Sequence, residues 1–415
     1  MTAGSGGSPA GTGGTASGTG GVAATGGVNG TGGTAGGSGR GTGGSSQGGA
    51  TGATGGRSGT GGAAGAAGMS GTGGNPGIGG QSGTGVVAAG VRWVGRVDLT
   101  DAQHPRFSWS GTGFVARFSG TGLSIQISNS GGIPVLFKPV VDGTPGAVKS
   151  IATGQQTASI ASGLSAGMHT VELYRQTEGS QGDSQLMGIT IAGGALVAPP
   201  AAPARLIEVV GDSITCGYGT LGTLSDSDCF PTESHWDTYE AVAGRALGAD
   251  VSTIAISGQG AYRNYGGDMN NTLPMVYTRA LTNDASPAWD FRTQAQAVIV
   301  NLGTNDISNG KGDPGAPFET AYTGLLTTIR AKHPGALIMC IIGPLLSGTD
   351  LTTIQGHLRN AVSARMAAGD QNIEVFDKIA AQTTDKAACQ YHPNPAENQI
   401  MATQIVAELR SRLGW

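Results

Sequence analysis

The sequence has no block of basic residues, no long apolar run and only four cysteines among its 415 residues. With a net charge of −4 and a pI near 5.9, it lacks the basic patch that marks nucleic-acid-binding proteins. No apolar stretch approaches the roughly 18 residues of a membrane-spanning helix. From Met1 onwards the sequence shows neither the basic nor the apolar region of a signal peptide. We therefore expect neither a nucleic-acid partner nor a transmembrane segment.

The spacing of the four cysteines indicates which metal sites and disulfides the chain could form. Cys216, Cys229, Cys340 and Cys389 form no C-x-x-C pair, so no zinc site is predicted. Cys216 and Cys229 flank a loop rich in Gly, Ser and Asp, whose closure by a disulfide would add about 3 kcal/mol on the chain-entropy model. We predict the pairs Cys216–Cys229 and Cys340–Cys389, on condition that the protein is exported. The alternative is four separate thiols, with Cys340 as an ordinary core residue.

The N-terminal stretch is made mostly of Gly, Ser, Thr and Ala. Its first 85 residues hold about half of the 77 glycines, and their only charged side chains are Arg40 and Arg57. Such a segment cannot bury enough apolar surface to offset chain entropy, so residues 1–86 are predicted to form a disordered tether. Glycine does not recur at every third position of this stretch, so a collagen triple helix is not expected. Because long uncharged tethers are typical of exported proteins, we expect an extracellular or surface-tethered protein, with an export signal upstream of Met1.

Residues 87–198 read as short strands separated by glycine-rich turns. Leu123, Ile125 and Ile127 share one face of such a strand, as the period of two requires. Many short strands at spacings of about 8–12 residues predict a β-sandwich or jelly roll. The aromatic residues of this region are expected in the core rather than on a sugar: Trp93, Phe107, Trp109 and Tyr174. The strands are expected at 91–97, 114–118, 123–128, 135–141, 157–160, 169–175 and 187–191.

Beyond the proline-rich junction at 199–203, strands alternate with helices to residue 415. This succession predicts an α/β domain, with a parallel sheet covered by helices on both faces. Together with the two preceding regions it accounts for the two to three domains expected from the length. Strands are expected at 206–210, 251–256, 297–302, 336–342 and 373–376, and helices at 236–247, 317–332, 352–368 and 395–413.

Four strand ends in the α/β domain carry residues suited to chemistry. Ser213, Gly258 and Asn305 follow the first three strands, and His392 precedes the last helix. Ligands of open α/β sheets bind at the carboxyl ends of the strands, so the four should converge. Taken singly, Ser213 is as well explained as a helix cap, Asn305 as a turn former and His392 as a loop residue. Together they favour a catalytic site.

The chemistry of these residue types assigns each a role. Ser213 would be the nucleophile, and His392 the general base that takes its proton and later protonates the leaving alcohol. The backbone N–H groups of Ser213 and Gly258, with the Asn305 amide, would donate to the oxyanion. The predicted reaction is ester hydrolysis through an acyl-enzyme.

These segments resemble the four blocks of the SGNH hydrolases, the superfamily of GDSL-type lipases and esterases. The resemblance narrows to carbohydrate esterase family 2, over residues 91–415. It is carried by G-D-S-I-T-C-G-Y-G, S-G-Q-G-A-Y-R-N-Y, W-D-F and N-L-G-T-N-D, behind a β domain with V-G-R and H-T-V-E-L. It implies a flavodoxin-like three-layer α/β domain and removal of acetyl groups from polysaccharides such as xylan and mannan, with no metal or cofactor. It also implies the roles assigned above.

One departure concerns the acid that orients the histidine. Most SGNH enzymes place an aspartate three residues before it, where this chain has Cys389, and relatives often have one at the position of Gln390. In serine proteases, replacing that acid by its amide lowers turnover about 10⁴-fold. We expect a backbone carbonyl to accept the Nδ1 hydrogen, since Ser–His dyads of this kind are known in the family. Asp385 is the alternative acid.

Substrate contacts are expected from Tyr262, Asn264 and Tyr265 after the oxyanion glycine, from Trp289, and from Tyr391 beside the base. Aromatic faces and hydrogen-bonding groups suit pyranose rings, although loop packing explains each residue equally well. The interpretation is a monomeric, exported acetyl esterase acting on acetylated polysaccharide. The alternatives are another acyl hydrolase or an acyltransferase on the same scaffold, or a glycan-binding protein with a weakened catalytic centre.

Overall fold

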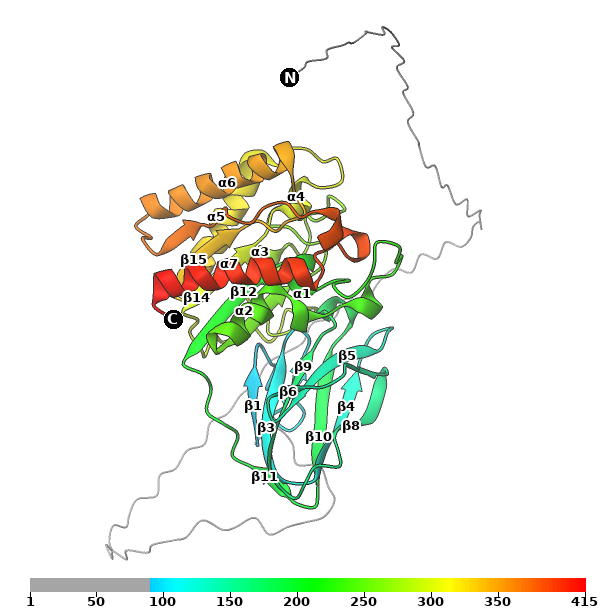
Figure 1. The fold of residues 1–415 in the computed structure, drawn as a ribbon. Helices are drawn as coiled ribbons and strands as arrows, with labels where there is room; N and C mark the ends of the chain where they lie inside the picture. The colour runs from blue at the N-terminus through cyan, green and yellow to red at the C-terminus, as the bar shows by residue number, and fades with distance from the viewer. Residues whose placement is uncertain (1–89) are drawn as a thin grey trace, which may run out of the picture. The chain divides into compact units, whose positions relative to one another are not determined.

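The computed structural model describes residues 90–415, so the tether predicted for residues 1–86 lies outside the described residues. The described part consists of a β domain, from β1 to β11, and an α/β domain, from β12 to α7 (Figure 1). Both belong to a single compact unit. Contacts between the two domains are therefore contacts within one unit.

The β domain contains two antiparallel sheets over one apolar core. Alternate residues of facing strands enter this core, among them Phe114 and Phe118 from one sheet and Ile125 and Ile127 from the other. The predicted period-two face of Leu123 is thus confirmed. One sheet is ordered β1 (Val91–Val94), β3 (Gly113–Gly120), β9 (Gly167–Arg175), β5 (Val135–Val141) and β6 (Thr144–Pro145), with β11 (Ala195–Val197) on β3 and β7 (Lys149–Ile151) on β5. The other is ordered β2 (Arg106–Phe107), β10 (Ser184–Ala192), β4 (Gly122–Asn129) and β8 (Gly154–Ala161).

The α/β domain is built on a five-stranded parallel sheet, as predicted. Its strands at 297–301 and 337–341 are apolar on both faces because helices cover both. The order is β13 (Ala249–Ala255), β12 (Arg205–Gly211), β14 (Ala297–Asn301), β15 (Leu337–Ile341) and β16 (Ile373–Val375). In chain order this is 2-1-3-4-5, the flavodoxin-like arrangement, which reverses direction between β12 and β14. The crevice at that switch point is where such folds bind ligands.

Helices form a layer on each face of this sheet. Ala297 and Ile299 of β14 point to α2 (Tyr239–Leu247) and α7 (Pro395–Leu413), which lie side by side in Figure 1. Val298 and Val300 point to the opposite layer, made of α5 (Gly315–Lys332) and α6 (Gly348–Ala367). The remaining helices are short: α1 (Ser213–Cys216), α3 (Leu273–Val276), α4 (Thr304–Ile307), and the 3-10 turns η1 (Gly179–Gln181), η2 (Phe230–Thr232), η3 (His235–Asp237), η4 (Thr384–Lys386) and η5 (Cys389–Tyr391).

Buried residues of the β domain extend into the α/β domain. The Trp109 ring is fully buried in the core cluster of the α5 and α6 layer, and its Nε1 donates to Ala280 O at 3.0 Å. Arg96 donates to Glu208 Oε2 on β12 at 3.2 Å, with both side chains buried. The two domains therefore share part of their core.

The predicted disulfide pairs are wrong. The disulfide joins Cys229 to Cys389, whereas Cys216 and Cys340 are buried free thiols. Cys340 lies on β15 and faces the α5 and α6 layer, away from the turn of Cys389. That turn lies against the loop after α1, where a Cβ at Gly219 would come within 2.7 Å of Cys389 Cβ. Sequence spacing could not reveal this, because the two loops meet only in the folded domain.

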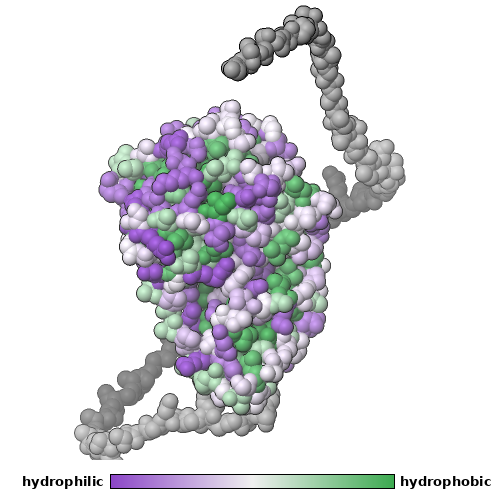
Figure 2. Space-filling model, viewed as in Figure 1, coloured by the Kyte–Doolittle hydropathy of each residue, from purple (hydrophilic) through white to green (hydrophobic). Residues whose placement is uncertain are grey.

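No helix within residues 90–415 combines the length and the apolar composition that crossing a bilayer requires. On the face of the molecule in Figure 2, hydrophobic residues form scattered patches interrupted by hydrophilic ones. Single exposed apolar side chains of this kind are normal on proteins. Two exposed aromatic residues, Tyr265 and Tyr391, adjoin the site described next.

Candidate active site

Ser213 is presented by the sharp turn that follows the central strand β12. It is the first residue of α1, and the preceding Asp212 caps this helix by accepting from Ile214 N at 3.1 Å. The helix ends after one turn at Gly217, which has a left-handed φ of 82°. Ser213 therefore sits at the carboxyl edge of the sheet, beside the switch point. The sequence alone left capping and nucleophilic roles open, and here the cap is Asp212.

His392 lies 179 residues after Ser213 in the sequence, but the fold brings the two side chains together. Its Nε2 lies 2.7 Å from Ser213 Oγ. Asn394 fixes the chain just after it, because its Oδ1 caps α7 by accepting from Ala396 N and Glu397 N at 3.0 and 3.1 Å. A nucleophile and a base at hydrogen-bond distance are the first requirement for covalent catalysis.

A backbone carbonyl, rather than a carboxylate, lies at the second ring nitrogen of His392. Its Nδ1 is 3.2 Å from Cys389 O, which also accepts from His392 N at 3.0 Å. Asp385 lies elsewhere, with its exposed carboxylate accepting from Thr383 Oγ1 and Lys386 Nζ at 2.6 and 3.0 Å. An Nδ1–H donated to Cys389 O leaves Nε2 unprotonated, the tautomer that a base acting on Ser213 needs.

Burial tunes the histidine towards its neutral form. Loss of solvation lowers the pKa of His392 to about 4, against the raising effect of the carbonyls of Cys389 and Gln390. The ring packs edge-on against Tyr218, with centroids 5.0 Å apart, and Tyr218 packs in turn on Phe230 at 5.1 Å. Neutral imidazole is the form that accepts a proton from serine.

Gly258 lies in the turn after β13, where its φ of 77° is in the left-handed region that favours glycine. A Cβ there would meet only Tyr265 Cβ at 3.9 Å, so backbone conformation rather than space selects glycine. The turn is closed by Tyr265 N, which donates to Gly258 O at 2.7 Å. Gln259, the next residue, connects this turn to Asn305.

Asn305 on α4 joins the Ser213 and Gly258 turns. Its Nδ2 donates to Gln259 O at 2.9 Å and to Asp212 Oδ2 at 3.2 Å. Burial raises the pKa of Asp212 to about 7. The neighbouring Asp306 holds the loop after Gly258, because its carboxylate accepts from the backbone N–H groups of Ala261, Tyr262 and Arg263. All four predicted strand ends thus meet at one edge of the sheet.

The predicted substrate contacts divide into two groups. Tyr265 and Tyr391 are 51% and 65% exposed, and their backbones adjoin the site: Tyr265 N donates to Gly258 O, and Tyr391 directly precedes His392. Asn264 is buried within its own loop, where it accepts from Gly260 N and donates to Asp268 and Asn270. Tyr262 packs against the core. Trp289 lies against the guanidinium groups of Arg96 and Arg292, before the amino end of β14.

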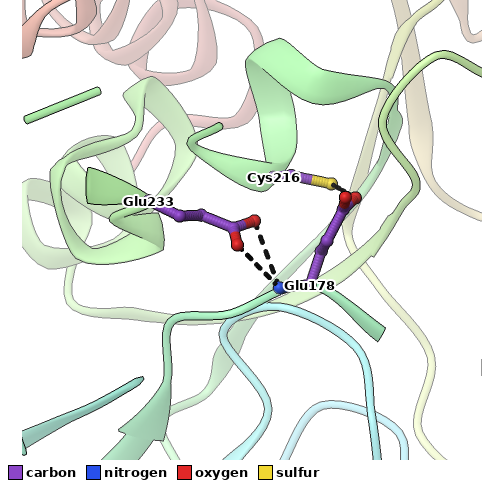
Figure 3. Close-up of side chains that lie close together, drawn as sticks. All are labelled: Glu178, Cys216 and Glu233. Carbon is purple, nitrogen blue, oxygen red and sulfur yellow. Dashed lines mark hydrogen bonds between the residues drawn. The ribbon is translucent and has the colours of Figure 1, made fainter. Parts of the chain in front are cut away.

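Sequence reasoning missed two contributors to this site. Tyr218 was not singled out, although it lies five positions after Ser213 in the same glycine-rich segment. Glu178, from the β domain, lies with Cys216 and Glu233 in the one group of three potential metal ligands within residues 90–415 (Figure 3). No local pattern distinguishes Glu178 from a surface acid, because its partners are on other elements.

Comparison with known proteins places both domains in described families. The model for the carbohydrate esterase 2 N-terminal domain matches residues 93–200, and that for the GDSL-like lipase/acylhydrolase family matches residues 209–400. The chain is 34% identical to the cellulase/esterase CelE of Acetivibrio thermocellus over 328 residues, 79% of this chain but 40% of that protein. It is 26% identical to an acetylxylan esterase/glucomannan deacetylase of Cellvibrio japonicus, over 78% of this chain and 89% of that one.

A solved structure agrees with these matches. It is described as a family two carbohydrate esterase from Clostridium thermocellum in complex with cellohexaose. It superposes with a TM-score of 0.75 at 34% identity and covers 79% of this chain and 100% of its own. On this evidence, with a catalytic-type Ser213–His392 pair on a GDSL fold behind a matching β domain, the chain belongs to carbohydrate esterase family 2.

Proposed function

We propose that this chain is a serine esterase that removes O-acetyl groups from polysaccharides of the xylan or mannan type. The observation that carries the proposal is the 2.7 Å contact of Ser213 Oγ with His392 Nε2, backed by Cys389 O at Nδ1. The Cellvibrio relative is an acetylxylan esterase/glucomannan deacetylase, and these two activities indicate the substrate class.

In the first half-reaction His392 Nε2 takes the Ser213 proton while Oγ bonds to the acetyl carbonyl carbon. The carbonyl oxygen becomes an oxyanion between Ser213 N, Gly258 N and Asn305 Nδ2. The Asn305 amide reaches it by giving up the longer of its two bonds, that to Asp212 Oδ2 at 3.2 Å. The ester C–O bond then breaks, and His392 gives its proton to the leaving sugar hydroxyl.

The second half-reaction repeats these steps with water. His392 takes a proton from water as its oxygen attacks the acetyl-Ser213 carbonyl, and returns that proton to Ser213 Oγ as acetate leaves. The attack that opens each half-reaction therefore needs a neutral histidine. The low pKa of His392 favours that state across the neutral and mildly acidic range.

We propose that the exposed side chains of Tyr265 and Tyr391 bind the glycan. Each exposes an aromatic side chain with a hydroxyl, which suits the C–H faces and hydroxyl rims of pyranose rings, and each lies on a turn of the site, next to His392 in the chain or bonded to Gly258 O. We further propose a jelly-roll topology for the β domain, export of the protein, and a monomeric state.

The test is acetate release from acetylated xylan, acetylated glucomannan and 4-nitrophenyl acetate by the wild type and Ser213→Ala. We expect Ser213→Ala to lose about 10⁴-fold or more in turnover, as serine hydrolases do. Its binding to the deacetylated glycan, measured by calorimetry, should persist. Equal acetate release by both proteins would overturn the proposal, and glycan binding without release by either would make the chain a binding protein.

A further inference from the structure

A buried acidic cluster joins the β domain to the two turns that carry Ser213 and Gly258. Glu178 follows β9 of the β domain, Cys216 ends α1, and Glu233 lies between η2 and η3 (Figure 3). They are 1%, 0% and 2% exposed. Burial of polar and ionisable groups is costly unless each finds hydrogen-bond partners, so their contacts identify what the cluster does.

The carboxylate of Glu178 contacts both active-site turns. Its Oε2 accepts from Ser257 N at 2.7 Å and from Cys216 Sγ at 3.1 Å. Its Oε1 accepts from Ser180 Oγ at 2.8 Å, within its own loop. Ser257 immediately precedes Gly258, and Cys216 closes the helical turn that Ser213 opens. A single carboxylate oxygen thus spans the two segments whose N–H groups face the oxyanion.

The rest of the cluster holds Glu178 in place. Its N–H donates to both carboxylate oxygens of Glu233 at 3.1 Å. Burial and the adjacent Glu178 raise the pKa of the Cys216 thiol, which therefore stays protonated and donates. All four oxygens of Glu178 and Glu233 accept from protein donors, so the cluster is complete as a hydrogen-bond network.

We propose that Glu178 is a positioning residue of the oxyanion site, through which the β domain sets the distance between the Ser213 and Gly258 turns. The inference rests on the proposed function. Ser257 N–H has its acceptor in the β domain, so the Ser257–Gly258 peptide takes its orientation from a side chain outside the α/β domain. A misplacement of about 1 Å at a reacting centre costs on the order of 10²-fold in rate.

The rival explanation is that Glu178 only holds the two domains together. A matched control exists at the other end of β13, where Arg92 of the β domain forms an ion pair with Asp250. Asp250→Asn weakens an interdomain contact by the same carboxylate-to-amide change, but at the end of the strand remote from Gly258. An effect confined to interdomain stability should be similar for both positions.

The experiment compares Glu178→Gln, Glu178→Asp and Glu178→Ala with Asp250→Asn, measuring kcat and KM for 4-nitrophenyl acetate and the unfolding temperature. Glutamine keeps an acceptor oxygen at the same reach, whereas aspartate keeps the charge but falls short of Ser257. We expect Glu178→Ala and Glu178→Asp to lose about 10–100-fold in kcat with KM within about twofold, by misplacing one donor. Glu178→Gln should retain most of kcat, and Asp250→Asn all of it.

Several outcomes would overturn the inference. These are an unchanged kcat in folded Glu178→Asp or Glu178→Ala, and a KM increase with constant kcat. Retention of more kcat by the aspartate than by the glutamine variant would also count against it. If none of the three Glu178 variants folds, the residue is required for folding and the inference fails. Ser213→Ala, assayed alongside, separates the two proposals, because its full activity would refute the esterase mechanism itself.

Discussion

The second ring nitrogen of His392 faces the backbone carbonyl of Cys389 in this structure, rather than an acid. A carbonyl fixes the ring tautomer through Nδ1 as a carboxylate would, at 3.2 Å. It brings no full negative charge to stabilise the imidazolium, so the carbonyls of Cys389 and Gln390 offset only part of the cost of burying that cation. The result is a base with a lowered pKa, close to 4.

The pH dependence of activity follows from this pKa. Protonation removes the base, and burial moves protonation below the usual value near 6.5, so kcat/KM should stay level from neutral pH down to about pH 5. It should fall about tenfold per unit below about pH 4. A profile of kcat/KM with 4-nitrophenyl acetate tests this, with circular dichroism confirming the fold at each pH. A decline centred near pH 6.5 would contradict it.

Asp385 gives a second residue-scale prediction. Its carboxylate is exposed and bonded to Thr383 and Lys386. Asp385→Asn should therefore leave kcat within about twofold, the small effect typical of exposed positions. His392→Ala provides the inactive reference in the same assay. A hundredfold drop in Asp385→Asn would make Asp385 the orienting acid.

At the scale of elements, the disulfide links the loop after α1 to the turn η5, which His392 follows directly. Cys389 contributes twice, with its side chain to the disulfide and its carbonyl to His392. The glycines at 219 and 222 make room for it, since a Cβ at either would lie within 2.9 Å of Cys389 Cβ. The position of the usual acid is thus occupied by a covalent anchor.

Breaking this anchor should affect stability and turnover together. Cys229→Ser should lower the free energy of unfolding by about 2–5 kcal/mol, the range for native disulfides. It should also lower kcat by about tenfold or more through misplacement of the His392 ring. Urea unfolding and steady-state kinetics measure the two. Cys340→Ala, a core thiol on β15, is the control that should spare kcat.

At the scale of the molecule, we expect the two domains to unfold as one unit, because their cores merge at Trp109. Trp109→Ala should cost about 3–5 kcal/mol, as large aromatic truncations do. Calorimetry should show one transition for residues of both domains, shifted to lower temperature in the variant. Two separated transitions in the wild type would contradict a shared core.

Local patterns in the sequence were enough to predict the sheet and its active edge. The strands of the α/β domain are short apolar runs, and Ser213, Gly258, Asn305 and His392 stand where those runs end. Partners distant along the chain could not be predicted. The pairing of Cys229 with Cys389, across 160 residues, depends on two loops meeting after folding.

Individual side chains also differ in whether their role depends on local sequence or on partners distant along the chain. Trp289 suited sugar stacking by type, but Arg96 from the β domain covers its ring. Asn264 suited hydrogen bonding to a sugar, but its own loop uses both ends of its amide. Glu178 accepts hydrogen bonds from Ser257 and Cys216, which lie on other elements. Each outcome depends on a neighbour that no local sequence pattern identifies.

The acetyl-enzyme provides the most direct test of the central claim, that Ser213 is the nucleophile of a deacetylase. The wild type is mixed with excess 4-nitrophenyl acetate at mildly acidic pH and quenched in acid within milliseconds. The peptide containing Ser213 is then examined by mass spectrometry. We predict an acetyl group on Ser213 that disappears on longer incubation and is absent from Ser213→Ala. Turnover with no acetyl group on Ser213, and undiminished in Ser213→Ala, would contradict the account.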